Sequence, residues 1–434
     1  MPEPLELPVN LYGQHIGELV REERGAFLRW APAEELPWPL LSPALSFNLQ
    51  VGFSSVEKTE SFFGGLLPEG AHLGDLARQV KVDREDVVGL LDAVGSDVAG
   101  ALSVGRPRNR GEPEFLTSEQ VAQLTADARG FLVGGGGSAL PGFQRKLTLT
   151  RLDGQWVRGN GTLPSTHILK PVPAEDRSAA ESELYVLSLA RTLDLLHFEA
   201  WTEDIGRLAT LVVERYDRRR TESGEIERLH QEDAGQAIGL PWGGAEKFEA
   251  NDERSNLRAV AALLDGDRTV FTPGLPDTEK LLRYMTLNVA AGNTDAHAKN
   301  FSLIHEQDGG TRLAPYYDSA PLALAYDART DMAMRVNGIS QLPEVTVDDL
   351  VAEAASWGVD PSTARSIVDE TLARVIEATR LLPAHDTIAA HIPGYIRGQA
   401  QNLLAGRRAR IESTIPLALM RHLGTPQGRT ETPR

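Results

Sequence analysis

The segment Gly292–Leu303, GNTDAHAKNFSL, restricts the fold of this chain more than any other feature. It places an acid, a histidine, a lysine and two asparagines within eight residues, between apolar stretches. The preceding residues have helical spacing, with Asp277 in the N-cap position and apolar side chains four apart from Leu281 to Val289. This helix should end near Gly292, so the polar cluster is predicted to form a loop at the mouth of a helical lobe.

Two of these polar residues, Asp295 and Asn300, have the spacing of the catalytic loop of protein kinases. In such a loop the acid orients or accepts the proton of the attacking hydroxyl, and the asparagine oxygen helps to hold Mg²⁺. Lys299 could neutralise charge on the transferred phosphoryl group, because this chemistry depends on positioning and electrostatics. A capped helix end followed by a solvated turn is the more common explanation of so short a motif.

A metal site built from Asp295, His297 and His305 is a second alternative. An acid and a histidine two positions apart rarely face one cation without further ligands, and the sequence contains no HExxH-type pattern. The sequence therefore disfavours a metal site of this kind.

Two further residues have the positions that a kinase needs. Residues 301–318 read as two strands joined by an Asp-Gly-Gly turn and end in Asp318, as does the kinase segment that supplies another Mg²⁺ ligand. Lys170 closes the strand THILK, where it could pair with ATP phosphates and with an acid on the next helix. Glu183 is the best-placed acid and Glu181 the second choice. The alternatives are a turn residue for Asp318 and a lysine reaching solvent for Lys170.

A glycine-rich segment precedes these strands. Residues 134–146 read GGGGSALPGFQRK, and their backbone amides together with Lys146 could hold phosphates. The segment lacks a strict GxGxxG pattern, and a flexible linker is the alternative.

Composition excludes several classes of protein. The formal net charge of −17 argues against nonspecific binding to nucleic acid or to anionic membranes. The absence of cysteine rules out disulfides, thiolate zinc sites and a cysteine nucleophile. The first residues, MPEPLELPVN, do not resemble a signal peptide, and apolar runs such as 208–213 are too short to span a bilayer. We expect a soluble cytoplasmic protein without membrane contact.

The pattern changes along the chain in three stages. Residues 1–106 are expected to be a β-rich N-terminal subdomain, which begins with a hairpin in LPVNLYGQHIGELV. Residues 107–229 combine strands with a helix at 178–193, and residues 230–434 are mostly helical. In the last part, DPSTARSIVDETLARVIEATRLLP has Asp360 as N-cap and Pro361 at the first helical position.

Several motifs taken together resemble the HipA family of bacterial serine/threonine kinase toxins. FFGGLLPEG (residues 62–70) is similar to the N-terminal signature of the family, and PGFQRK (141–146) looks like the core of its phosphate loop. HILK, ERYDRR (214–219), HQEDAGQAIGLP, GNTDAHAKNFS and YYD follow in the order of the family. The resemblance implies an α+β, two-lobed protein-kinase-like fold with an extra β-rich N-terminal subdomain and an all-helical C-terminal lobe.

The resemblance also assigns roles to residues. Asp295 would be the catalytic base, with Lys170 and Lys299 as the other catalytic residues, and Asn300 and Asp318 would hold Mg²⁺. Glu214, Arg215 and Tyr216 would line the adenine pocket as the hinge between the lobes. By pattern alone, ERYDRR would be a solvated charge run. The nucleotide-binding residues would be Pro141, Gly142, Phe143, Gln144, Arg145, Lys146, Lys170, Glu214, Arg215, Tyr216, His297, Ala298, Lys299, Asn300, Tyr317 and Asp318.

One position departs from the family. A serine whose autophosphorylation ejects the phosphate loop and silences the kinase is expected at residue 139, where this chain has Ala139. Alanine has no hydroxyl, so this means of inactivation should be missing unless the adjacent Ser138 substitutes for it. We expect incubation with ATP to leave residue 139 unmodified and activity undiminished.

The resemblance implies an ATP- and Mg²⁺-dependent kinase that phosphorylates a serine or threonine of a cellular protein. Aminoacyl-tRNA synthetases are among the targets of the family, so growth arrest is implied. A helix-turn-helix antitoxin of the HipB type would neutralise the toxin, and operator DNA would be reached only through that complex. The alternatives are a small-molecule kinase and a non-catalytic kinase-like module that binds an antitoxin.

Overall fold

The computed structural model describes most of the chain. The described residues are 4–32, 41–45, 54–106, 112–127, 140–141, 145–264, 276–306, 310–324, 330–385 and 391–409. Among them, no helix is both long and apolar enough to cross a bilayer.

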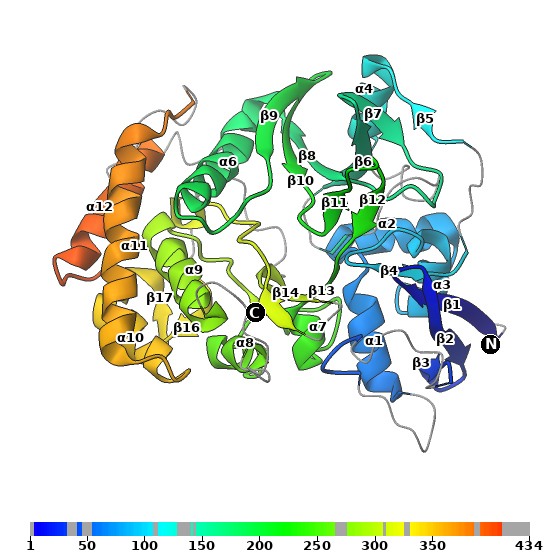
Figure 1. Cartoon of the computed structure of the whole chain (residues 1–434), viewed down its shortest axis with the longest axis horizontal. Helices are drawn as coiled ribbons and strands as arrows, with labels where there is room; N and C mark the ends of the chain where they lie inside the picture. The colour runs from blue at the N-terminus through cyan, green and yellow to red at the C-terminus, as the bar shows by residue number, and fades with distance from the viewer. Residues whose placement is uncertain are drawn as a thin grey trace, which may run out of the picture.

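A four-stranded antiparallel sheet with helices packed against it forms the N-terminal domain, at one end of the molecule (Figure 1). The predicted hairpin is confirmed, because β1 and β2 pair and are joined at Tyr12 and Gly13, both with positive φ. The sheet order is β3-β2-β1-β4. The elements are β1 (Leu5–Leu11), β2 (Gln14–Glu22), β3 (Gly25–Trp30), α1 (Val56–Gly65), α2 (Gly70–Val80), α3 (Val87–Val94) and β4 (Leu102–Val104).

The next domain, the N-lobe, contains a six-stranded sheet of order β5-β7-β6-β8-β10-β9. Its strand β10 alternates between two cores, since Val212 packs with the residues of α4 while Leu211 and Val213 pack with those of α6. The predicted strand THILK lies in β8, and the helix predicted at 178–193 is α6. The elements are β5 (Glu114–Phe115), α4 (Ser118–Ala126), β6 (Leu147–Leu152), β7 (Gln155–Arg158), β8 (His167–Pro173), α6 (Arg177–Thr192), β9 (Ala200–Ile205), β10 (Leu208–Glu214), β11 (Arg218–Arg220) and β12 (Ile226–Arg228).

Helices dominate the last domain, the C-lobe, which lies at the other end of the molecule from the N-terminal domain (Figure 1). The predicted helix 361–381 begins as expected, with Asp360 as N-cap and Pro361 in its first turn. Asp277, by contrast, is the first residue of its helix, and Pro276 is the N-cap. The helices are α7 (Ala234–Ile238), α8 (Leu257–Leu263), α9 (Asp277–Ala291), α10 (Val347–Ala355), α11 (Pro361–Leu381) and α12 (His391–Leu404).

The expectation of an all-helical C-terminal lobe is wrong in one respect, because this lobe also contains two small sheets. One has the order β13-β14-β15, and its β14–β15 pair is the hairpin predicted within 301–318. In the first sheet, β13, which precedes the catalytic loop in the sequence, pairs with β14, which follows it, so that the backbone groups of these buried strands are satisfied. The strands are β13 (His230–Asp233), β14 (Ser302–His305), β15 (Thr311–Leu313), β16 (Asp331–Val336) and β17 (Ile339–Gln341).

Candidate active site

Lys170 joins the two lobes through its ammonium group. It lies on β8, where its Nζ is 2.7 Å from Glu183 Oε1 of α6 and 2.5 Å from Asp318 Oδ1 of the C-lobe. Lys170 and Glu183 are buried, whereas the side chain of Asp318 is 41% exposed. Asp318 of the C-lobe therefore meets a lysine and a glutamate of the N-lobe in an ionic cluster that faces solvent on the Asp318 side.

The segment that contains Asp295 and Asn300 is held by its own backbone. The amide nitrogens of His297 and Asn300 donate to the carbonyls of Asp295 and His297 at 2.7 and 2.8 Å. Asn300 Nδ2 also donates to the carbonyl of Asp295 at 2.9 Å. Because the side-chain nitrogen of Asn300 makes this bond, the orientation of its side-chain oxygen is fixed as well.

A buried polar network connects this loop to the residue that follows Asp318. Asn293 Oδ1 accepts from the amide of Asp295 at 3.1 Å, and its Nδ2 donates to Asn288 Oδ1 at 2.9 Å and to Ser319 Oγ at 3.0 Å. The Tyr316 hydroxyl donates to Asn288 Oδ1 at 2.6 Å. Asn293 therefore links the catalytic-loop segment to the Asp318 segment.

Charges in the cluster stabilise one another. Desolvation alone would raise the pKa of Asp318, but the ammonium groups of Lys170 and Lys146 hold that pKa well below its usual range. Desolvation would likewise lower the pKa of Lys170, and the Asp318 and Glu183 carboxylates raise it instead. For Lys146 desolvation prevails and lowers the pKa to about 8. The cluster thus holds ionised Asp318 and Lys170 beside Lys146, whose pKa burial lowers to about 8.

The remaining residues of the catalytic loop face the protein interior. His297 is buried with its ring edge-on to Phe248 at 5.3 Å, and burial lowers its pKa well below the usual range. Lys299 does not extend toward Asp318, since its Nζ lies 2.8 Å from Glu69 Oε1 of the N-terminal domain and 3.8 Å from Asp233 Oδ2. Ala298 is buried.

Of the predicted hinge residues, Tyr216 lies beside Tyr317, whereas Glu214 and Arg215 make their hydrogen bonds elsewhere. The rings of Tyr216 and Tyr317 are 5.6 Å apart, and Tyr317 donates to the carbonyl of Lys299 at 2.9 Å. Glu214, half-buried, accepts from the amide of Glu199 through its carboxylate. Arg215 instead donates to Ser165 Oγ at 2.9 Å, in a buried network described below.

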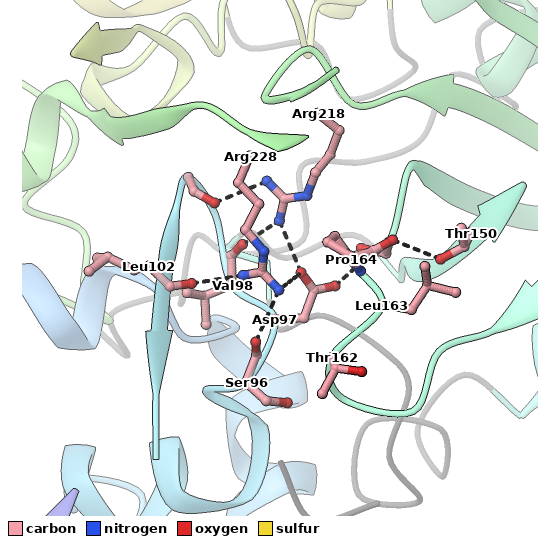
Figure 2. Close-up of polar contacts among 12 residues, drawn as sticks. Ser96, Asp97, Val98, Leu102, Thr150, Thr162, Leu163, Pro164, Arg218 and Arg228 are labelled. Atoms are coloured by element: carbon pink, nitrogen blue, oxygen red, sulfur yellow. Dashed lines mark hydrogen bonds and ion pairs between the residues drawn. The ribbon is translucent and has the colours of Figure 1, made fainter. Parts of the chain in front are cut away.

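The interpretation of residues 214–219 as a solvated charge run is wrong, because Arg215, Asp217 and Arg218 are buried. Figure 2 shows Arg218 and Arg228 converging on Asp97 of the N-terminal domain, at 3.0 and 3.2 Å. Charge alternation along the sequence could not reveal this network, because the partner carboxylate lies more than a hundred residues upstream.

Much of the predicted phosphate loop lies outside the described residues, namely Ser138, Ala139, Gly142, Phe143 and Gln144. Of its flanks, the carbonyl of Pro141 accepts from Lys146 Nζ at 2.5 Å, and Arg145 is exposed. The loop assignment therefore stays a prediction.

His305, which the alternative metal site requires, is bound elsewhere. Its Nε2 lies 2.8 Å from Glu232 Oε1, with both side chains fully buried. His297 Nε2 lies 4.0 Å from Asp295 Oδ2. Within the described ranges, no group of three histidine, aspartate or glutamate side chains is arranged to hold a metal ion.

Comparison with known proteins defines the class. Over 96% of this chain and all of the other, the structure superimposes with a TM-score of 0.74 and 22% identity on HipA of Shewanella oneidensis MR-1, solved with HipB and operator DNA. The chain thus has a kinase-like fold, a class that the lysine–glutamate pair across the N-lobe also fits.

The chain belongs to the HipA family. The HipA N-terminal domain matches residues 7–105, and the HipA-like C-terminal domain matches residues 138–379. Protein Y4mE of Sinorhizobium fredii, which carries the name of a kinase, is 32% identical over 360 residues, or 78% of this chain and 84% of that protein. The serine/threonine-protein kinase toxin HipA of Shewanella oneidensis is 26% identical over 319 residues, or 68% and 70%.

Proposed function

We propose that this protein is a toxin kinase that transfers the γ-phosphoryl group of ATP to a serine or threonine of a cellular protein. The observation that carries the proposal is the contact of Lys170 with both Glu183 and Asp318. In kinases this lysine–glutamate pair must form for phosphates to be positioned, and the acid of the C-lobe is a metal ligand. Growth arrest, through a target such as an aminoacyl-tRNA synthetase, is part of the proposal.

The proposed roles take the resemblance to the HipA family as their starting point. Asp295 accepts the proton of the attacking hydroxyl. General base catalysis of this kind increases a reaction rate by about 10²- to 10⁴-fold. Lys170 binds ATP phosphates, and Lys146 adds a second positive charge beside Asp318. Tyr216 and Tyr317, whose rings lie side by side, flank the adenine.

The donor set fits a magnesium ion. Asp318 offers a partly exposed, ionised carboxylate, and Asn300 offers an oriented amide oxygen, and Mg²⁺ prefers such hard oxygen ligands together with water and phosphate. Bound Mg²⁺ would neutralise charge on the phosphates. The Lys170–Asp318 contact would then break, because Asp318 would bind the metal and Lys170 would bind the phosphates.

A HipB-type antitoxin is the proposed partner, since the solved HipA of Shewanella oneidensis was captured with HipB and operator DNA. With a net charge of −17, this chain repels DNA phosphates, so the antitoxin would supply most of the contacts to the operator.

Phosphoproteomics of cells expressing the intact chain or the Asp295→Asn variant tests the proposal. We expect a phosphoserine or phosphothreonine on a cellular protein only with the intact chain, and growth arrest that follows the same difference. Phosphate on a metabolite instead of a protein would indicate a small-molecule kinase. ATP binding without any transfer would indicate a non-catalytic module.

Mass spectrometry of the purified chain after incubation with ATP tests the proposal for Ala139. We expect no phosphate on residues 138–139 and no loss of activity with time. Rapid inactivation accompanied by phosphate on Ser138 would contradict it.

A further inference from the structure

Glu69, at the corner between α1 and α2, belongs to the N-terminal domain but makes its ionic contacts with the C-lobe. Its side chain is 3% exposed. It occupies the N-cap position of α2 without capping that helix. Instead Oε2 lies 2.7 Å from Lys247 Nζ, and Oε1 lies 2.8 Å from Lys299 Nζ. Although burial alone would raise its pKa, Lys299 and Lys247 hold that pKa well below the usual range.

The corner can approach the C-lobe closely because two residues of α1, Gly64 and Gly65, have no side chain. A Cβ on Gly65 would lie 2.6 Å from Gln236 Cγ, and Gln236 Nε2 donates to the carbonyl of Phe62 at 2.7 Å. A Cβ on Gly64 would lie 2.3 Å from the ring of Trp242. The two glycines of the FFGGLLPEG motif therefore allow the helix to pack closely enough for Glu69 to reach Lys299.

Lys299 lies inside the segment that carries the catalytic groups. It directly precedes Asn300, whose amide and side chain bond to the backbone of His297 and Asp295. On the other side of Lys299, the amide of Ala298 donates to the carbonyl of Lys247 at 3.2 Å. A displacement of Lys299 would therefore also move the backbone of Asn300.

We infer that Glu69 is a positioning residue, which fixes the Asp295–Asn300 segment by anchoring Lys299 to the N-terminal domain. Buried ammonium groups need a counter-charge, and without Glu69 the nearest acid to Lys299 is Asp233 at 3.8 Å. Lys299 would then shift toward Asp233, its remaining counter-charge, and carry the adjacent Asn300 with it. This inference rests on the proposed kinase function and assigns Lys299 an anchoring role in place of a phosphate contact.

Steady-state kinetics of Glu69→Gln and Lys247→Met distinguish a positioning role of Glu69 from a contribution to protein stability alone. Glu69→Gln removes both ion pairs of this buried carboxylate, whereas Lys247→Met removes one of them and leaves the pair with Lys299 in place. We expect both to lower the melting temperature. Only Glu69→Gln should lower kcat, by about 10- to 100-fold with KM for ATP within about twofold, because small misplacements of reacting groups slow chemistry by such factors. An equal loss of kcat in both variants would overturn the inference.

A double-mutant cycle tests the anchoring role of Lys299. If Lys299 acts through Glu69, then Lys299→Met and the double variant Glu69→Gln/Lys299→Met should have the same kcat as Glu69→Gln, because one link is lost in each. A much larger loss in Lys299→Met, accompanied by a raised KM for ATP, would show a direct phosphate contact and contradict the inference.

Hydrogen exchange of the ATP-free protein supplies a readout that does not depend on activity. We expect faster exchange at the amides of His297, Ala298 and Asn300 in Glu69→Gln, and exchange close to wild type in Lys247→Met. Unchanged exchange in Glu69→Gln would overturn the inference. If the wild-type chain transfers no phosphate, the proposed function fails, and hydrogen exchange still decides the positioning role.

Discussion

At the scale of single residues, the chemistry of each side chain could be predicted better than its contacts. The sequence offered Glu183 and Glu181 as partners of Lys170, and the contact is with Glu183. Residues two apart on a helix point in nearly opposite directions, so Glu181 instead faces Arg177 and His385. Lys299 shows the limit of this reasoning, because its partner Glu69 comes from another domain.

Lys146 leads to a prediction about pH. Desolvation lowers its pKa to about 8, below the value of 10.5 for a free lysine, so its positive charge is lost as pH rises through about 8. We expect the Kd for a non-hydrolysable ATP analogue to rise about tenfold between pH 7.5 and 9.5, since one pKa unit corresponds to about 1.4 kcal/mol. Calorimetry should show weaker and pH-independent binding for Lys146→Met. A wild-type Kd that is flat over this range would refute the prediction.

Asn293 leads to a prediction about catalysis. In Asn293→Asp the new oxygen cannot donate to Asn288 or Ser319 and faces the Asn288 carboxamide oxygen, so the connection between the catalytic loop and the Asp318 segment is weakened. We expect kcat to fall about 10- to 100-fold, as for other small misplacements of reacting groups. The exposed Asn251→Asp is the matched control and should keep wild-type kcat in the same phosphotransfer assay. Equal activity of the two variants would show that the connection is dispensable.

At the scale of secondary structure, elements with clear spacing and caps could be predicted, and glycine-rich ones could not. Helix α11 has Asp360, Pro361 and a continuous apolar face, and its beginning was predicted correctly. Helices α1 and α2 were missed because glycines disfavour helix in isolation. Helix α1 packs against Gln236 and Trp242 of the C-lobe, and α2 packs into the core of the N-terminal domain, and local sequence encodes neither contact.

Two glycine substitutions test this explanation. Gly65→Ala should destabilise the protein by about 1–3 kcal/mol, because the added methyl overlaps Gln236. Gly74→Ala, in α2 with open space around its Cβ, should stabilise it by about 0.5–1 kcal/mol through helix propensity alone. Urea unfolding measures both free energies. Stabilisation by Gly65→Ala would mean that α1 does not pack as described.

At the scale of the whole molecule, the sequence patterns predict a β-rich, a mixed and a helical part in succession, but they do not predict the contacts that join these parts. The joins are buried charges from distant parts of the chain, and single-sequence patterns carry no information about such pairs. Asp97 accepts from Arg218, Arg228 and the amide of Ser165 (Figure 2). Although burial opposes it, these arginines lower the pKa of Asp97 to about 2.

The Asp97 site predicts a large effect on stability. Asp97→Ala leaves the half-buried Arg228 without a carboxylate partner and the buried Arg218 with Asp217 alone, and should cost about 3–5 kcal/mol in urea unfolding at pH 7. The difference from wild type should persist above about pH 4 and shrink as pH falls toward 2, because Asp97 contributes only while ionised. Asp204→Ala, which removes an exposed pair with Arg177, should cost less than about 1 kcal/mol. Similar losses in both variants would contradict a buried join.

The ionic character of these joins bears on how the protein can be divided. Cutting the chain after residue 106 would expose Asp97 and Glu69 on one fragment and Arg218, Lys247 and Lys299 on the other. Each fragment would carry an excess of charge of one sign on a face that is buried in the intact chain. Such fragments should recombine in dilute salt and separate in concentrated salt, as two halves of one molecule rather than as independent modules.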